Sequence, residues 1–208
     1  MFNGSLVLRS LNNPNFFFIQ IGSCEGIVHD PIRNHVIRYH WSGVLVEPVK
    51  YLFDKLVDNY KNEKNLMFEN SAISQENGSR DFYRIRESND PLPYWYHQLG
   101  SFYLSNILKH KNSIPDIEDR IVTEKIPTLT LKRLIEKYNI KSIDLLHIDA
   151  EGYDYEILKQ IASINIKPKM ILFENQHLSN ADREASGDLL KKEGYSILEI
   201  AVDTFAFL

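Results

Sequence analysis

The chain has 208 residues, of which 43% are hydrophobic, 25% charged and 12% aromatic, so a sizeable buried core is available. The formal net charge of −4 and a pI near 6.0 argue against the broad basic face of a protein that binds nucleic acid. Cys24 is the single cysteine, which rules out an intrachain disulfide, and no apolar run approaches the roughly 20 residues that span a bilayer. We therefore expect a cytoplasmic protein with no membrane span and no nucleic-acid partner.

Short apolar runs alternate with helical stretches along most of the chain, which is typical of an α/β sheet. The expected strands are 16–21, 43–48, 66–70, 79–85, 142–149, 169–174, 195–200 and 204–208. The expected helices, recognised by apolar residues at helical spacing, are 29–41, 51–60, 128–140, 151–161 and 182–194. The order predicts a doubly wound, mostly parallel sheet, with 79–85 as a peripheral or antiparallel strand and a closing pair of strands.

Residues 87–125 interrupt this alternation with a long segment that is rich in Pro, Tyr, Trp and Asn. We interpret 1–208 as one domain that carries this segment as an insertion with one short helix, and the insertion could close over a substrate as a lid. Its residues Trp95, Tyr96 and Ser101 are candidates for binding a sugar. The same aromatic side chains could instead form a hydrophobic cluster under a long loop, or a contact in a homodimer.

Polar and glycine residues follow five of the expected strands, where each strand ends. Ligands of doubly wound sheets bind beyond the carboxyl ends of the strands, so these residues are expected to surround a site. In chain order they are Gly22 to Gly26, Glu47 and Pro48, Ser71 and Ala72, Asp149 to Gly152, and Glu174 to His177.

The turn after the first strand decides which nucleotide fits. A dinucleotide fingerprint needs a second glycine where Cys24 stands, and the carboxylate of Glu25 would repel a pyrophosphate. Glu47, at the end of the second strand, can accept hydrogen bonds from ribose hydroxyls. These residues favour a positively charged nucleoside without phosphates, and S-adenosylmethionine is such a molecule.

The segments "FIQIGSCEG", "VLVEPVKYLFDKL", "NSAIS", "IDAEGYDYEILK" and "ILFE" occur in this order. Together they resemble the FkbM family of S-adenosylmethionine-dependent methyltransferases, and "IDAEGYDYEILK" is similar to that family's I-D-x-E-G-x-E-x-x-x-L-K pattern. Gln20 stands where many members carry Asp, and Cys24 where Asn is common. The resemblance implies a class I methyltransferase fold, a seven-stranded sheet with an antiparallel last strand. It also implies O-methylation, often of a sugar in a glycan, glycolipid or natural product.

The resemblance and the strand ends together assign roles to individual residues. Residues around the methionine part of the cofactor come from the glycine turn, the ribose is placed at Glu47, and the adenine is placed between Ser71 and Ala72. The residues expected to bind the cofactor are Gly22, Ser23, Cys24, Gly26, Glu47, Pro48, Ser71, Ala72 and Asp149.

A base for the acceptor hydroxyl is expected among Asp149, Glu174 and His177, with Glu151 binding the acceptor. Asp149 could instead cap the helix that follows it. His147, inside an apolar strand, is expected to be a core histidine with a satisfied hydrogen bond. Glu151, Glu174 and His177 could also bind a divalent ion, but no spacing is diagnostic of a metal, so no metal ligand is assigned and the need for a metal stays open.

Two other functions stay open on the sequence. One is a nicotinamide-dependent sugar oxidoreductase on a similar sheet, against which the turn at Cys24 and Glu25 argues. The other is a non-catalytic binding module with a decayed cofactor site, which Gln20 keeps open. The expected partner is a small molecule or a glycan, and the sequence leaves the oligomeric state open.

Overall fold

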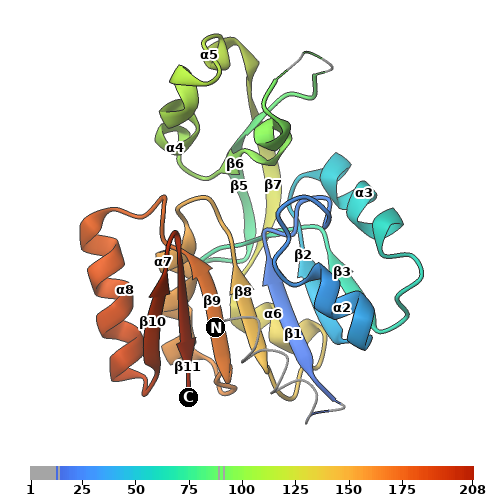
Figure 1. Ribbon diagram of the computed structural model, residues 1–208, viewed down its shortest axis with the longest axis vertical. Coiled ribbons are helices and arrows are strands. Elements are labelled where there is room, and N and C mark those ends of the chain that lie inside the picture. Colours follow the sequence, from blue (N-terminus) through green and yellow to red (C-terminus); the bar gives the residue numbers. More distant parts are fainter. Residues whose placement is uncertain (1–12, 14, 89, 91) are drawn as a thin grey trace.

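The computed structural model describes residues 13, 15–88, 90 and 92–208, and a seven-stranded sheet forms its centre (Figure 1). The strands lie in the order β10-β11-β9-β8-β1-β2-β3. Their bounds are Phe17–Ile21 (β1), Ser42–Val46 (β2), Leu66–Glu69 (β3), Leu145–Ile148 (β8), Met170–Glu174 (β9), Ser196–Ile200 (β10) and Asp203–Phe207 (β11). Neighbours from β3 to β9 pair in parallel, whereas β11 is antiparallel to β9 and β10. The predicted mostly parallel sheet with an antiparallel last strand is confirmed.

Helices cover both faces of this sheet, which is why its central strands read as continuous apolar runs. The helices are Arg33–Tyr39 (α2), Lys50–Asn59 (α3), Leu131–Lys137 (α6), Asp154–Leu158 (α7) and Asn180–Lys192 (α8). Val36 and Leu56 of α2 and α3 pack with Phe18 on one face, and Leu134 of α6 and Ile157 of α7 pack on the other. The core thus holds the strand ends of the main sheet in a fixed arrangement.

A second sheet, in the order β4-β7-β5-β6, carries a lobe that projects above the main sheet (Figure 1). Its strands are Ala72–Ile73 (β4), Gly78–Ile85 (β5), Gly100–Ser101 (β6) and Ile121–Leu129 (β7). Its helical segments are Tyr94–Gln98 (η1), Leu104–Leu108 (α4), Lys109–Asn112 (η2) and Ile117–Arg120 (α5). The prediction of one short helix in the insertion is wrong. The predicted strand at 79–85 is confirmed, because β5 pairs antiparallel with β7 over eight residue pairs.

The predicted helix at 128–140 begins too early. Thr128 and Leu129 belong instead to β7, whose residues alternate in exposure and which pairs with β5 and β4. The helix α6 starts at Leu131, because the Thr130 hydroxyl caps it by accepting the backbone N–H of Arg133 at 3.1 Å. Similarly, α7 starts at Asp154 rather than at 151, and it continues into a 3-10 turn at Lys159–Ser163 (η3).

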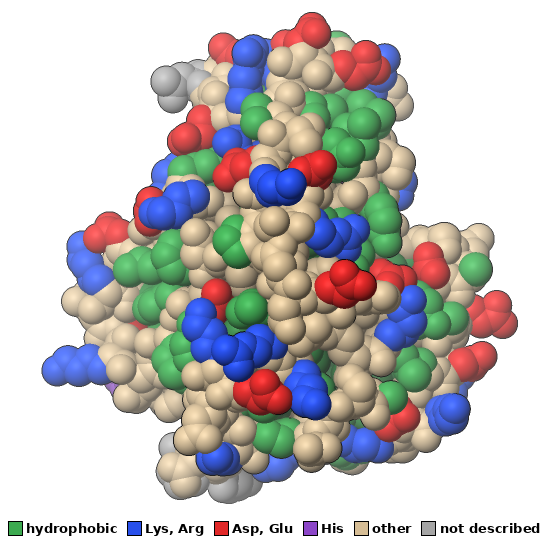
Figure 2. Space-filling view, turned by 180° about the vertical axis from the view of Figure 1, so that it is seen from behind, with side chains coloured by type: hydrophobic (Ala, Val, Ile, Leu, Met, Phe, Trp, Pro, Cys, Tyr) green, Lys and Arg blue, Asp and Glu red, His purple; other side chains and the backbone are tan. Residues whose placement is uncertain are grey.

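The rear surface carries acidic and basic side chains close together, with small hydrophobic areas between them (Figure 2). Neither sign of charge covers that face as a broad patch, in keeping with the small formal net charge of −4. In the described ranges, no helix is both long enough and apolar enough to cross a membrane.

Candidate active site

A cavity with about 960 Å³ of empty space, its open mouth included, lies at the carboxyl edge of the main sheet. It is bounded by residues that follow β1, β2 and β8, by β4, and by part of the projecting lobe. The predicted site residues that line it are Gly22, Ser23, Cys24, Glu47, Pro48, Ser71, Ala72, Asp149 and Glu151. The structure therefore brings residues from four distant segments of the chain to one cavity.

The glycine turn after β1 depends on the missing side chain at Gly22. The backbone there has a φ of +79°, and a Cβ would lie 1.8 Å from the carbonyl oxygen of Asp149. The ends of β1 and β8 thus touch through backbone alone. Gly26 also has a positive φ, but a Cβ there would meet the ring of Tyr60 at 2.5 Å. Gly26 shapes the loop without lining the cavity, which differs from its predicted contact with a cofactor.

Glu47 is a buried carboxylate held rigidly at the end of β2. Its Oε2 accepts the backbone N–H of Cys24 at 2.9 Å, and its Oε1 accepts that of Val49 at 2.8 Å. Burial raises the pKa of Glu47 to about 7, although these two backbone donors act in the opposite direction. Burial and the nearby carboxylates, Glu47 first, also raise the pKa of the Cys24 thiol, so Cys24 is unsuited to act as a nucleophile.

Several cavity-lining side chains have a buried polar atom with no hydrogen-bond partner among the described residues. They include Gln20 Oε1, Ser71 Oγ and His147 Nδ1. Gln20 and His147 lie opposite each other on β1 and β8. The prediction that His147 is a core histidine with a satisfied hydrogen bond is wrong for Nδ1, and burial lowers its pKa to about 4, so the ring is neutral. Unsatisfied buried polar atoms are costly, and a bound ligand would satisfy them.

The loop after β8 carries Asp149 into the cavity. Burial raises its pKa to about 7, and Asp154 and Asp203 add to this effect. The alternative that Asp149 caps the following helix is wrong, because Asp154 ties down this loop instead. The Asp154 carboxylate accepts the backbone N–H groups of Ala150 at 3.2 Å and Gly152 at 3.1 Å. Asp149 is therefore free of a capping role.

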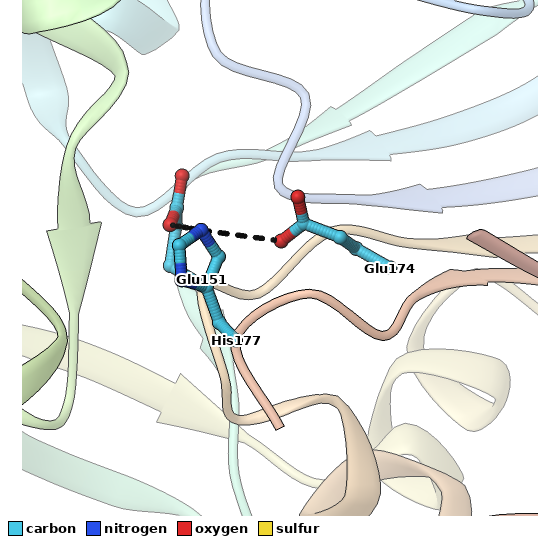
Figure 3. Close-up of side chains that lie close together, drawn as sticks. All are labelled: Glu151, Glu174 and His177. Atoms are coloured by element: carbon cyan, nitrogen blue, oxygen red, sulfur yellow. Dashed lines mark ion pairs between the residues drawn. The ribbon is translucent and has the colours of Figure 1, made fainter. Parts of the chain in front are cut away.

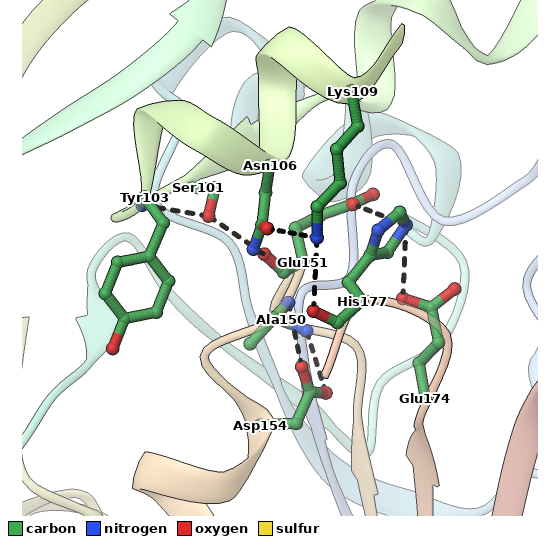
Figure 4. Close-up of polar contacts among 10 residues, drawn as sticks. Ser101, Tyr103, Asn106, Lys109, Ala150, Glu151, Asp154, Glu174 and His177 are labelled. Atoms are coloured by element: carbon green, nitrogen blue, oxygen red, sulfur yellow. Dashed lines mark hydrogen bonds and ion pairs between the residues drawn. The ribbon is translucent and has the colours of Figure 1, made fainter. Parts of the chain in front are cut away.

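The projecting lobe fixes the backbone at Glu151 (Figure 4). The carbonyl oxygen of Glu151 accepts hydrogen bonds from Asn106 Nδ2 at 2.7 Å and from the Ser101 hydroxyl at 2.9 Å. Glu151 has a φ of 49°, an unusual conformation that these contacts help to hold. Lys109 Nζ donates to Asn106 Oδ1 at 2.7 Å and to the carbonyl oxygen of His177 at 3.5 Å. Sequence reasoning missed Asn106 and Lys109, since nothing local marks them.

The predicted acceptor-binding residues of the lobe lie elsewhere. Ser101 is fully buried and its hydroxyl is engaged by Glu151, so its predicted role is wrong. Tyr96 is also fully buried, in a cluster with Leu99 and Ile107, which contradicts a sugar platform and confirms the alternative of a hydrophobic cluster. The Trp95 ring packs against His110 at 5.1 Å and does not line the cavity. From this part of the lobe, the cavity is lined by His97 to Gly100.

Glu174 and His177 meet Glu151 beside the cavity (Figure 3). The Nε2 atom of His177 lies 3.3 Å from Glu151 Oε2 and 3.7 Å from Glu174 Oε2. Burial, followed by repulsion from Asp149 and Glu151, raises the pKa of Glu174 to about 10. Burial lowers the pKa of His177 to about 4. Neither side chain lines the cavity, whereas Glu151 does. The predicted catalytic roles of Glu174 and His177 therefore require that they act on the acceptor through Glu151.

The strand order and the cavity at the strand ends define a Rossmann-like class I methyltransferase fold. The chain belongs to the FkbM methyltransferase family, whose domain model matches residues 20–197. Methyltransferase FkbM from Methylobacillus flagellatus is similar in structure, with 10% sequence identity and a TM-score of 0.55 over 94% of this chain and 44% of that one. This chain therefore spans less than half the length of that protein.

Two further solved structures resemble the chain more weakly. Fibrillarin from Aeropyrum pernix, crystallised with natively bound S-adenosyl-L-methionine, has 10% identity and a TM-score of 0.47 over 92% of this chain and 66% of that one. Precorrin-6y C5,15-methyltransferase from Geobacter metallireducens has 11% identity and a TM-score of 0.45 over 98% of this chain and 86% of that one. No curated protein sequence matches this chain. At such low identities, the structural likeness is one of fold alone.

Proposed function

We propose that this protein is an S-adenosylmethionine-dependent O-methyltransferase that acts on a hydroxyl of a sugar, glycan, glycolipid or natural product. The family assignment supports methyl transfer. The main support for the proposal is the cavity at the strand ends. Its wall includes Asp149 and the Glu47 carboxylate, which two backbone hydrogen bonds hold in place. The formal net charge of −4 favours an acceptor other than nucleic acid.

The residues of the cavity fit this cofactor. Glu47 has both carboxylate oxygens fixed by backbone donors, which leaves their other lone pairs for ribose hydroxyls. The unpartnered Ser71 Oγ and the neighbouring Ala72 suit the adenine. The unpartnered Gln20 Oε1 and His147 Nδ1 can accept hydrogen bonds from the amino group of the methionine part. Gln20 would do so as a neutral acceptor, which explains how an amide can serve where many family members have Asp.

The proposed reaction is an in-line displacement. When bound, the cofactor supplies a methyl group on a sulfonium; the acceptor oxygen forms an O–C bond, and the C–S electron pair goes to sulfur. Asp149 lies in the cavity and accepts the proton of the acceptor hydroxyl. Glu151 orients the acceptor next to it, because the lobe fixes its backbone. His97 and Gln98 extend the cavity wall into the lobe, which supports its proposed role as a lid.

Transfer of radioactive methyl groups tests this function. Purified protein is incubated with S-adenosylmethionine labelled in its methyl group and a panel of glycans, glycolipids and small alcohols. We expect label in an acceptor, and the label should survive mild alkali, because methyl ethers are stable where methyl esters hydrolyse. Label that is released by alkali would show that a carboxylate is methylated and would overturn the assignment of O-methylation at a hydroxyl.

The affinity for S-adenosylhomocysteine should depend on the ionisation of Glu47. Its pKa is raised to about 7, and ribose hydroxyls bind the ionised form, so affinity should rise with pH through 7 and then level off. Below pH 7, each pH unit should cost up to about tenfold in affinity. Calorimetric titrations between pH 6 and 8 measure this dependence. Glu47→Gln should bind more weakly and lose most of the slope, whereas a flat wild-type profile would contradict the role of Glu47.

Asn106→Ala should impair catalysis through the position of Glu151. The variant removes one of the two donors to the Glu151 carbonyl, at a cost of about 1–2 kcal/mol in the free energy of unfolding. We expect kcat/KM to fall by about tenfold, mainly through KM for the acceptor, with cofactor affinity unchanged. Asn112→Ala, at an exposed position of the same lobe, is the matched control. Equal kinetics for the two variants would rule out this positioning role.

A further inference from the structure

Glu151, Glu174 and His177 converge from three places along the chain onto one point (Figure 3). Glu151 lies in the loop after β8, Glu174 ends β9, and His177 lies in the turn that follows. One ligand atom from each residue lies within 4.8 Å of the other two. Nitrogen and oxygen ligands that bind one cation at about 2.1 Å lie roughly 3.0–3.4 Å apart. Small side-chain rotations would therefore bring these three atoms to coordination distance.

Hydrogen bonding among the three residues does not account for their arrangement. Both carboxylates face the same ring nitrogen of His177, which carries at most one proton. The 3.7 Å separation from Glu174 Oε2 is beyond hydrogen-bond reach. Glu174 Oε2 is buried and has no hydrogen-bond partner among the described residues, although it points toward the cluster (Figure 3). Buried polar atoms normally have a hydrogen-bond or ligand partner, and a cation bound among the three side chains would supply one for Glu174 Oε2.

The side chain of Lys109 does not fill this role. Its Nζ is used by Asn106 Oδ1 at 2.7 Å and by the carbonyl oxygen of His177 at 3.5 Å (Figure 4). The His177 side chain is only 9% exposed, so bulk solvent screens the cluster weakly.

We propose that Glu151, Glu174 and His177 bind one divalent cation of the first transition row, such as Mn²⁺. One imidazole and two carboxylates suit Mn²⁺, Fe²⁺ or Zn²⁺ better than Mg²⁺, which prefers oxygen ligands alone. Three protein ligands leave coordination positions open, as in catalytic metal sites. Glu151 also lines the cavity, so the cation lies where a molecule in the cavity can reach it.

A cation at this site would restrict the acceptors to molecules that can coordinate it. This inference about the acceptor rests on the proposed function. Two open positions would hold a molecule through two neighbouring oxygens, such as a vicinal diol or a hydroxy acid. The bound cation lowers the pKa of a coordinated hydroxyl, whose proton passes to Asp149 as its oxygen attacks the methyl group. Bond making and bond breaking are otherwise unchanged: the O–C bond forms, and the C–S electron pair goes to sulfur.

Titration with Mn²⁺ in the absence of cofactor tests the site. Chelator-treated, full-length protein is titrated, and free Mn²⁺ is followed by electron paramagnetic resonance. We expect one Mn²⁺ per chain, and Glu174→Gln and His177→Gln should each weaken binding by about tenfold or more. Glu184→Gln is the matched control, since Glu184 is an exposed carboxylate on α8. Its affinity for Mn²⁺ should equal that of the wild type.

Thermal melting of each variant shows that weaker binding is not caused by unfolding, and Glu151→Gln provides an independent third variant. The proposal is overturned if folded Glu174→Gln and Glu151→Gln bind Mn²⁺ as the wild type does, or if the wild type binds none. Mn²⁺ binding and S-adenosylhomocysteine binding are measured separately, so failure of the cation site can be distinguished from failure of the proposed function. A protein that binds Mn²⁺ through these residues but does not bind S-adenosylhomocysteine would retain the cation site and lose the proposed methyl transfer.

Discussion

Replacing Asp149 with asparagine is expected to reduce methyl transfer by about 10²–10⁴-fold, which is the usual contribution of a positioned base. Asparagine has nearly the same shape but cannot accept the proton of the acceptor hydroxyl. Asp149 lines the cavity and caps no helix, so the fold does not require its charge. Single-turnover methyl transfer under saturating cofactor measures the loss directly.

The melting temperature of Asp149→Asn distinguishes loss of the base from loss of the fold. Burial and neighbouring carboxylates disfavour the charge of Asp149, so Asp149→Asn should melt at the same temperature as the wild type or higher. Asp188→Asn, an exposed aspartate on α8, should change neither activity nor melting. Full activity in Asp149→Asn would remove Asp149 from the reaction.

Gly22→Ala is expected to have the largest effect on the fold around the cofactor. Alanine would place its Cβ 1.8 Å from the Asp149 carbonyl oxygen, at a φ of +79° that L-residues rarely adopt. Because the atoms that this Cβ would meet are backbone atoms of Asp149, which no side-chain rotation can move, the two strand ends must separate. We expect a loss of about 3 kcal/mol or more in the free energy of unfolding, together with loss of S-adenosylhomocysteine binding. Chemical denaturation and calorimetry measure the two effects.

Gly187→Ala is the control for this change. Gly187 lies inside α8, and a Cβ there would come no closer to another group than 4.0 Å, at Ile197 Cδ1. The substitution should stabilise the chain by about 0.5–1 kcal/mol, because alanine favours a helix over glycine. Similar stability of Gly22→Ala and Gly187→Ala would show that β1 and β8 do not need their close contact.

Much of the main sheet and the cavity could be predicted, because the signals are local. Continuous apolar runs mark buried parallel strands, and the residue that ends each run lies at the same edge of the sheet. This rule brought Glu47 and Asp149 together from positions about a hundred residues apart in the chain. Gln20 and His147 were harder to interpret. Their unpartnered atoms become meaningful only once the register places them opposite each other beside the cavity.

The lobe could not be predicted in the same way, because its structure depends on pairing between distant segments. Residues 121–129 form a strand by pairing with β5 and β4, some forty to fifty residues earlier, whereas the sequence placed 121–125 in the insertion and 128–129 at the start of a helix. Aromatic composition also could not separate Tyr96, which fills the core of the lobe, from a side chain that faces a ligand. The contact of Asn106 with the Glu151 carbonyl is likewise set by tertiary structure alone.

A comparison of S-adenosylmethionine binding with NAD⁺ binding tests the central claim most directly. Calorimetry is carried out on one preparation with S-adenosylmethionine, S-adenosylhomocysteine and NAD⁺, at pH 8, where Glu47 is mostly ionised. We predict that the first two bind with one molecule per chain and compete with each other, and that NAD⁺ does not bind, since Glu25 and Cys24 leave no turn for a pyrophosphate. Tight binding of NAD⁺ together with no binding of S-adenosylmethionine would contradict the assignment of this cavity.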